Sequence, residues 1–146
     1  MRAEGVLVSA CLLGLRCRHD ALPLDPLRLP EGLCPVPLCP EQLGGLPTPR
    51  PPAQMVGGDG VAVLEGRARV VDQRGEDVTE AFLRGAEEAV KVARLLGIRR
   101  AFLKEKSPSC GVKYTHRDGE LAEGMGVTAA ALRGAGVQVM SEEELR

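Results

Sequence analysis

The chain has 146 residues and a formal net charge of −1, with acidic and basic residues interspersed along it. That length fits a single domain, residues 1–146, with a proper buried core, and the balanced charge leaves no electrostatic footprint for nucleic acid or an anionic membrane. Aromatic residues make up only 2% and Trp is absent, which argues against a platform on which bases stack.

Five cysteines are present, an odd number in a chain that is long enough to need no disulfide framework. Only about three apolar residues precede Cys11, whereas the apolar region of a signal peptide needs roughly 7–15. No other run approaches the ~18 apolar residues of a membrane span. These features predict a protein of the reducing cytoplasm, with its cysteines as thiols or metal ligands.

The first part of the chain predicts two strands, a hairpin and a helix. Residues 5–10 form a continuous apolar run, typical of a strand buried on both faces of a parallel sheet. Residues 34–38 read as a second short strand, and their prolines would be confined to its ends or to a sheet edge. Residues 61–71 alternate around Glu65-Gly66 and predict a β-hairpin. Residues 78–96 place their apolar side chains on one helical stripe.

The second part continues the alternation of strands and helices. Residues 98–103 and 137–140 predict strands, residues 126–135 predict a helix, and Ser141 with Glu144 predicts the cap of a final short helix. This order favours an α/β domain with a mainly parallel sheet flanked by helices, Rossmann-like, with a β-hairpin insertion.

Three of the cysteines follow predicted strands directly: Cys11, Cys39 and Cys110. Ligands of open parallel sheets bind outside the carboxyl ends of the strands, so these cysteines are expected to converge at one edge. Three thiolates at one point suggest a metal, because uncompensated thiolates would repel and protonate. Structural zinc usually takes four ligands in closely spaced pairs, which are missing here, so an iron–sulfur cluster with one open iron fits better. Buried free cysteines without a metal remain the alternative.

Four segments resemble the signature of the DUF523 family, which includes the 2-thiouracil desulfurases. They are residues 8–18 (VSACLLGLRCR), 39–50 (CPEQLGGLPTPR), 75–79 (GEDVT) and 107–111 (SPSCG), in the family's order. The similarity covers essentially the whole chain. It implies that Cys11, Cys39 and Cys110 hold a [4Fe-4S] cluster through three irons. The fourth iron would take the thiocarbonyl sulfur of a thiolated pyrimidine such as 2-thiouracil, leaving the oxo base behind.

The resemblance also implies that Glu41 and Ser107 form a catalytic pair, with Glu41 as general acid or base and Ser107 as donor or proton relay. We expect Ser109, Arg50 and Asp20 to contact the substrate. Ser109 could also donate to cluster sulfur, Arg50 could equally brace its own loop, and Asp20 could orient its neighbour or fix a turn.

The remaining two cysteines have simpler explanations. Cys17 is expected to pack beneath the cluster loop rather than to act as a fourth ligand, and Cys34 is expected to be a small apolar residue at a strand start. A second hypothesis for the whole chain is a cluster- or zinc-binding accessory protein that stores or delivers sulfur to a partner in RNA thiolation.

Overall fold

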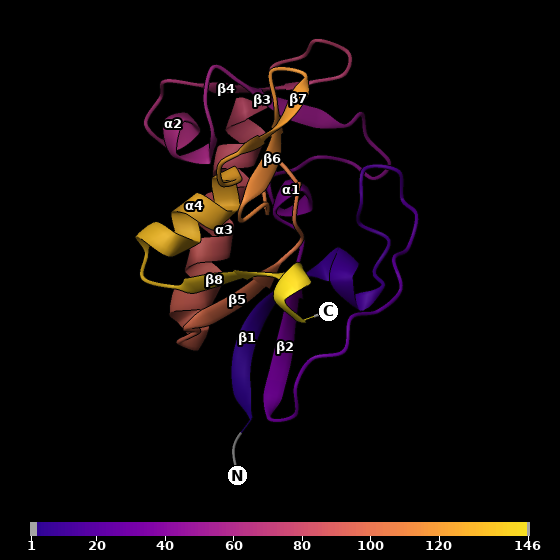
Figure 1. The fold of residues 1–146 in the computed structure, drawn as a ribbon, viewed down its shortest axis with the longest axis vertical. Coiled ribbons are helices and arrows are strands. Elements are labelled where there is room, and N and C mark those ends of the chain that lie inside the picture. The colour runs from indigo at the N-terminus through magenta and orange to yellow at the C-terminus, as the bar shows by residue number, and fades with distance from the viewer. Residues whose placement is uncertain (1–2, 146) are drawn as a thin grey trace.

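Four parallel strands form the first sheet of the computed structural model, which describes residues 3–145. They are β1 (Glu4–Ser9), β2 (Leu33–Leu38), β5 (Arg100–Leu103) and β8 (Gln138–Ser141), arranged in the order β2-β1-β5-β8. Figure 1 shows this sheet in the lower half of the view. The parallel sheet expected from the apolar runs is confirmed.

A second sheet lies at the other end of the molecule (Figure 1). Its order is β4-β3-β6-β7, built from β3 (Ala53–Val56), β4 (Arg69–Asp72), β6 (Tyr114–Arg117) and β7 (Glu120–Glu123). Strands β3 and β6 are parallel, whereas the two outer pairs are antiparallel. A turn at Asp118-Gly119 joins β6 to β7.

Two helices, α3 (Thr79–Leu96) and α4 (Val127–Gly134), pack against each other and connect both sheets. One core cluster joins Leu7 and Leu103 of the first sheet to Ala89 and Leu132 on these helices. A second cluster joins the other sheet to the first half of α3. The opposite face of the first sheet is covered by the 3-10 turns η1 (Ala10–Leu13) and η2 (Glu142–Leu145). Leucines of the loop between η1 and β2 complete this cover.

Helix α3 begins and ends where the sequence predicts. The Asp77 carboxylate accepts the backbone N–H of Thr79 at 2.9 Å, and Gly97 ends the helix in the left-handed region with φ 64°. Its central Gly85 allows the short helix α1 (Pro40–Leu43) to approach closely, because a Cβ there would lie 1.9 Å from the Pro40 carbonyl oxygen. The contact fixes α1, and with it the segment that follows β2, against α3.

The β-hairpin predicted for residues 61–71 is wrong. Helix α2 (Gly60–Leu64) occupies the first half, and its N-terminus is capped by Asp59, which accepts the Ala62 N–H at 3.2 Å. The second half is β4, which pairs with β3 rather than with its own neighbour in sequence. The alternation of apolar residues reflects one face of a single helical turn followed by a strand.

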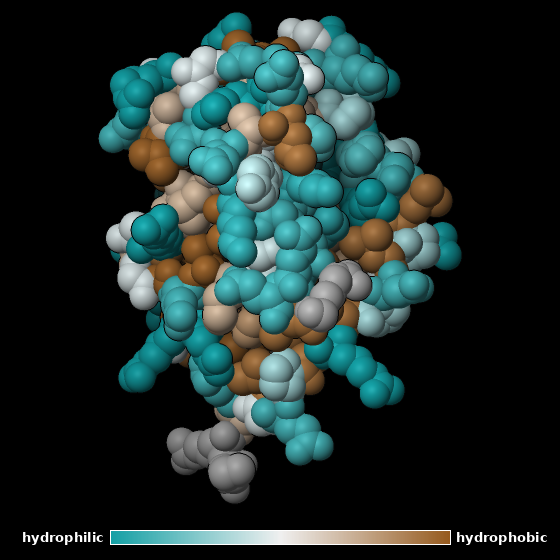
Figure 2. All heavy atoms as spheres, viewed as in Figure 1, coloured by the Kyte–Doolittle hydropathy of each residue, from teal (hydrophilic) through white to brown (hydrophobic). Residues whose placement is uncertain are grey.

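Strand β2 lies at an edge of the first sheet, as its prolines predict, because Pro has no N–H to donate to a further strand. The final capping pair is also present: Ser141 accepts the Glu143 N–H at 3.1 Å, and Glu144 accepts the Ser141 N–H at 2.9 Å. Figure 2 shows a mainly hydrophilic face with scattered hydrophobic residues. Within residues 3–145, no helix is long and apolar enough to cross a membrane.

Candidate active site

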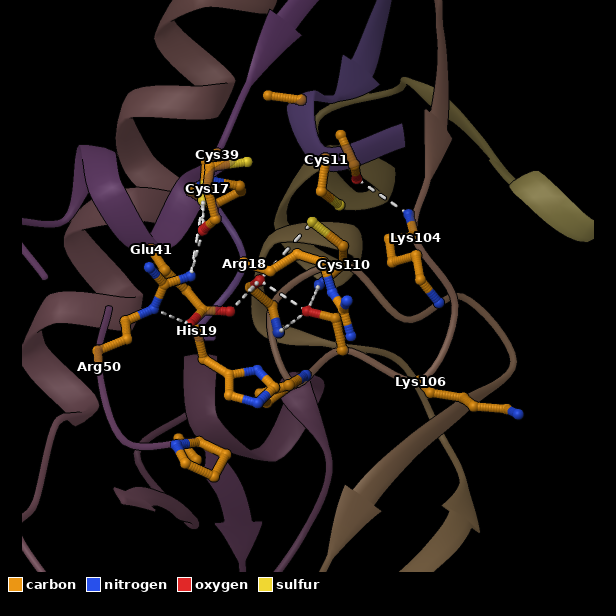
Figure 3. A pocket seen from close by; sticks show the side chains of 18 of the residues that line it. Cys11, Cys17, Arg18, His19, Cys39, Glu41, Arg50, Lys104, Lys106 and Cys110 are labelled. Carbon is orange, nitrogen blue, oxygen red and sulfur yellow. Dashed lines mark hydrogen bonds and ion pairs between the residues drawn. The ribbon is translucent and has the colours of Figure 1, made fainter. Parts of the chain in front are cut away.

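Three strand ends of the first sheet deliver cysteines to one cavity. Cys11 lies in η1 directly after β1, Cys39 stands between β2 and α1, and Cys110 lies in the loop after β5. All three line a cavity of about 330 Å³, seen from close by in Figure 3. The convergence expected from the strand order is therefore confirmed. Cys17 lines the same cavity, whereas Cys34 is exposed on β2.

The surroundings of these thiols favour their protonated form. Burial raises the pKa of Cys110 to about 12. A hydrogen bond with Cys11 is the main reason that the pKa of Cys17 is raised to about 11. A hydrogen bond with Cys17, together with burial, raises the pKa of Cys39 still further. Thiolates at these positions need a compensating positive charge, which a bound metal supplies as the protons leave.

No three His, Cys, Asp or Glu side chains in the described part of the chain are placed to hold a metal ion between them. In an iron–sulfur cluster each cysteine binds a different iron, so its ligand sulfurs stand farther apart than the ligands of one ion. Three cysteines around one cavity fit that donor set in number and in chemistry.

Glu41 is the acidic group of this cavity. It occupies the second position of α1, two residues after Cys39, and its side chain is only 14% exposed. Arg50 donates to its Oε1 atom at 2.8 Å, and Ser109 donates to its Oε2 atom at 3.1 Å. Both carboxylate oxygens are thus held in place by side chains from distant segments.

The loop after β5 is shaped by its own serines. The Ser107 hydroxyl oxygen accepts the backbone N–H groups of Ser109 and Cys110 at 3.2 and 3.1 Å. The Ser109 hydroxyl, in turn, lies 3.0 Å from that of Ser107 and 3.6 Å from the Cys110 sulfur. Gly111 is required by close approach, since a Cβ there would lie 2.5 Å from the Tyr114 carbonyl oxygen.

Glu105 holds the same loop from behind. It is 1% exposed, and its Oε1 atom accepts the N–H groups of Val112, Lys113 and Tyr114 at 2.9, 2.9 and 3.0 Å. Burial alone would raise the pKa of Glu105, but these N–H groups and the Ser141 hydroxyl outweigh it and leave the pKa lowered. A buried carboxylate therefore fixes the backbone of the loop that carries Cys110.

Basic side chains line the cavity alongside these groups: Arg18, His19, Lys104, Lys106 and His116. Lys106 and His116 are exposed, so they lie at the outer part of the lining. Lys104 is engaged, because it donates to the Glu105 carbonyl at 3.1 Å and pairs with Glu142 at 3.5 Å.

Comparisons with known proteins agree with this arrangement. The family model described as 2-thiouracil desulfurase matches residues 6–144. The chain belongs to the 2-thiouracil desulfurase family. It is 42% identical over 146 residues to the uncharacterized protein YbbK of Bacillus subtilis (strain 168), covering 96% of this chain and 97% of that protein. It is also similar to the structure of the [4Fe-4S]-dependent thiouracil desulfidase TudS, with 41% identity and a TM-score of 0.82 over 97% of this chain and 93% of that one.

The structure brings together all but one of the residues that the sequence selects within this desulfurase fold. Cavity-lining residues among them are Cys11, Cys39, Cys110, Glu41, Ser107, Ser109 and Arg50. Asp20 is not among the described residues that line the cavity. Its carboxylate accepts the Leu22 N–H at 3.0 Å and lies 3.5 Å from Arg18, so it fixes a turn and orients a neighbour. The Leu22 N–H is the main reason that the pKa of Asp20 is lowered.

Two residues of the site have no counterpart in the sequence-based prediction. Ser9 ends β1, accepts the Lys104 N–H at 2.9 Å and hydrogen-bonds to the Cys110 thiol, so it ties two strand ends together. Its signal in the sequence is a hydroxyl directly after a buried apolar run. Glu105 offered no signal, because an acidic residue between two lysines is typical of a solvated surface.

Proposed function

We propose that this protein is a [4Fe-4S]-dependent desulfurase that removes the sulfur of a thiolated pyrimidine such as 2-thiouracil. The net reaction is a hydrolysis: the thiocarbonyl compound and water give the carbonyl compound and hydrogen sulfide. No external oxidant or reductant is needed for that balance.

One observation carries the proposal. Three cysteines from three strand ends share a cavity with Glu41, which is held at both oxygens and lies beside the cysteines rather than on an outer surface. A structural metal site would not require an oriented carboxylate next to it, whereas a hydrolytic reaction requires a group that moves protons. The family membership and the similarity to TudS support the same reading.

Cys11, Cys39 and Cys110 would hold the cluster in this proposal. When bound, it supplies an open iron that acts as a Lewis acid toward a soft thiocarbonyl sulfur. Leu38 and Pro40 add apolar side chains to the lining beside the cysteines. Such apolar surface suits the face of a flat heterocycle.

Glu41 is the proposed general base and acid. Its Oε2 atom accepts from Ser109, whose hydroxyl oxygen lies 3.0 Å from that of Ser107. Because Ser107 already accepts two backbone N–H groups, its own proton is available to Ser109. Protons can thus pass between Glu41 and the half-buried Ser107 through one intermediate hydroxyl, and this path supports the proposal that the two residues act as a catalytic pair.

The deciding experiment compares wild type with Glu41→Gln after reconstitution without oxygen. We expect both proteins to bind about four irons per chain, and only the wild type to release sulfide from 2-thiouracil at a substantial rate. Glu41→Gln keeps the size of the side chain and an oxygen acceptor but removes the proton-transfer group. Loss of the cluster in this variant would make Glu41 structural and would contradict the proposed role.

The accessory-protein hypothesis predicts a different result. A sulfur carrier would release sulfide only in the presence of its partner, whereas the proposed enzyme does so alone. Wild-type protein that binds only zinc, or no metal, would refute the desulfurase proposal.

A further inference from the structure

Among the described residues that line the cavity, Arg50 is the one buried arginine. Its side chain is 5% exposed. It ends the Pro- and Gly-rich loop that follows α1, and its backbone N–H donates to the His19 carbonyl at 2.8 Å. A guanidinium that is buried to this extent must satisfy its donors within the protein or with a ligand.

Every donor of Arg50 has a protein acceptor. Nε donates to Glu41 at 2.8 Å. One terminal nitrogen donates to the Pro47 carbonyl at 3.2 Å and to the Thr48 hydroxyl at 2.9 Å. The other donates to the Cys17 carbonyl at 2.8 Å and to the Cys39 sulfur at 3.9 Å. Since a guanidinium has five N–H groups, none remains for a substrate carbonyl.

The two most informative contacts come from different nitrogens of the guanidinium. Through Nε it fixes the orientation of the Glu41 carboxylate, and through a terminal nitrogen it directs an N–H group at the Cys39 sulfur, at the long end of the range for such a contact. Hydrogen bonds to ligand sulfur and nearby charge are the means by which a protein sets the potential of an iron–sulfur cluster.

We propose that Arg50 is a positioning residue that couples the cluster to the acid–base group: it orients Glu41 and supplies a permanent positive charge and an N–H donor to Cys39. It does not contact the substrate. This inference rests on the proposed function, and it replaces the expectation that Arg50 binds the substrate with a role in the protein's own framework.

The charge has a predictable effect on the cluster. A cation near the ligand sulfur stabilises the more reduced and more negative state, so its removal shifts the reduction potential to a more negative value. A lysine keeps the charge, but its single ammonium group cannot reproduce the planar fork that serves Glu41 and Cys39 together. The two substitutions therefore separate the charge from the geometry.

The test uses Arg50→Gln and Arg50→Lys in the reconstituted holoprotein, with Arg18→Gln as the matched control. Arg18 also lines the cavity, but its side chain is 31% exposed and its partner is Asp20. Iron content, the midpoint potential from an anaerobic redox titration, and kcat and KM for sulfide release from 2-thiouracil are measured for each protein.

We expect R50Q to shift the potential to a more negative value than R18Q does, and R50K to stay near the wild-type potential. In both Arg50 variants kcat should fall at least ~10-fold while KM changes less than ~2-fold, because the proton-transfer group loses its orientation while no contact with the substrate is removed. If R50Q loads less iron than wild type, the kcat and KM of R50K decide.

Three results would overturn the inference. A raised KM with unchanged kcat makes Arg50 a substrate-binding residue. If R50Q shifts the reduction potential no more than R18Q does, the Arg50 contact with Cys39 does not influence the cluster. If R50K keeps the full kcat, the planar guanidinium is not needed. A wild type without cluster or sulfide release overturns the proposed function and this inference with it, whereas an active wild type with unaffected Arg50 variants overturns this inference alone.

Discussion

Replacing Glu105 with Gln is expected to destabilise the fold and to loosen the loop that carries Cys110. The wild-type carboxylate accepts three backbone N–H groups at 2.9–3.0 Å and is 1% exposed. Gln keeps one oxygen of the same size but loses the charge. The three N–H groups then bond to a neutral oxygen instead of a charged one, so each of these hydrogen bonds becomes weaker.

The magnitude follows from these bonds. A hydrogen bond to a charged group contributes about 1.5–3 kcal/mol and a neutral one about 1 kcal/mol, so weakening three such bonds costs about 1.5–6 kcal/mol. The cost of burying the carboxylate, which Gln avoids, offsets part of the loss. We expect Glu105→Gln to lower the free energy of unfolding by about 2–3 kcal/mol. This change corresponds to a decrease of roughly 1 M in the urea concentration at the unfolding midpoint.

The pH dependence gives a sharper test. The pKa of Glu105 is lowered from its ordinary value of 4.5 in the folded protein. A lowered folded-state pKa means that the carboxylate stabilises the fold fully above about pH 4.5, and that this contribution is lost as the pH falls through the folded-state value. The difference between wild type and Glu105→Gln should therefore be constant near neutral pH and shrink in acid.

Urea unfolding of the cluster-free, reduced proteins at several pH values measures both effects, with Glu65→Gln as control. Glu65 pairs with Arg67 on the surface, where its side chain is 54% exposed, so its replacement should change the free energy by less than about 0.5 kcal/mol. Equal midpoints for wild type and Glu105→Gln at pH 7, or a difference that persists unchanged in acid, would refute the reasoning.

Further predictions concern the cluster, the serine and the helix contact. Cys110→Ala should abolish the visible iron–sulfur absorption, whereas Cys34→Ala, exposed outside the cavity, should load like wild type. Ser107→Ala removes the acceptor of two backbone N–H groups and a relay hydroxyl, so kcat should fall at least ~10-fold with the cluster retained; unchanged kcat would exclude the relay. Gly85→Ala should lower the melting temperature, at a cost of about 1–3 kcal/mol, because its Cβ meets a carbonyl oxygen of α1 at 1.9 Å. Gly134→Ala, whose Cβ meets nothing within 4 Å, is its control, and equal melting temperatures would contradict the packing argument.

The first sheet and its cysteines were predictable because their determinants are local. The apolar run of β1 and the stripe of α3 specify buried elements by themselves, and the rule for parallel strands places the residues after them at one edge. Cys11, Cys39 and Cys110 needed only the positions of three strand ends. The prolines of β2 even indicated an edge position, which the strand order confirms.

The second sheet was not predictable from local patterns. Its strands have four residues each, and β3 pairs with β4 across the helix α2 and with β6 from a segment far along the chain. Short alternating runs carry the same apolar pattern whether they form a hairpin or a helical turn followed by a strand. The choice at residues 61–71 was decided by tertiary packing of Ala62 and Val63 against α3 and α4, which no local pattern reveals.

Roles within the site divide in the same way. Glu41 and Ser107 stand close in sequence to cysteines, so a motif can select them, although only the structure reveals that Ser109 makes the contact between them. The partners of Arg50 come from three separate segments, and its use as a framework residue depends on all of them being in place. A single arginine between prolines gives no indication of that.

The cavity therefore has two walls of different origin. The cysteine wall is the carboxyl edge of the first sheet, where chemistry can be read from strand ends. The facing wall includes Pro52 and Ala53 at the start of β3, His116 of β6, and the loop with Arg18 and His19. Because those segments are positioned by long-range pairing, the facing wall lies in the part of the fold that local sequence specifies least. We expect substitutions in the facing wall to change which thiolated base is accepted, while those in the cysteine wall remove the reaction altogether.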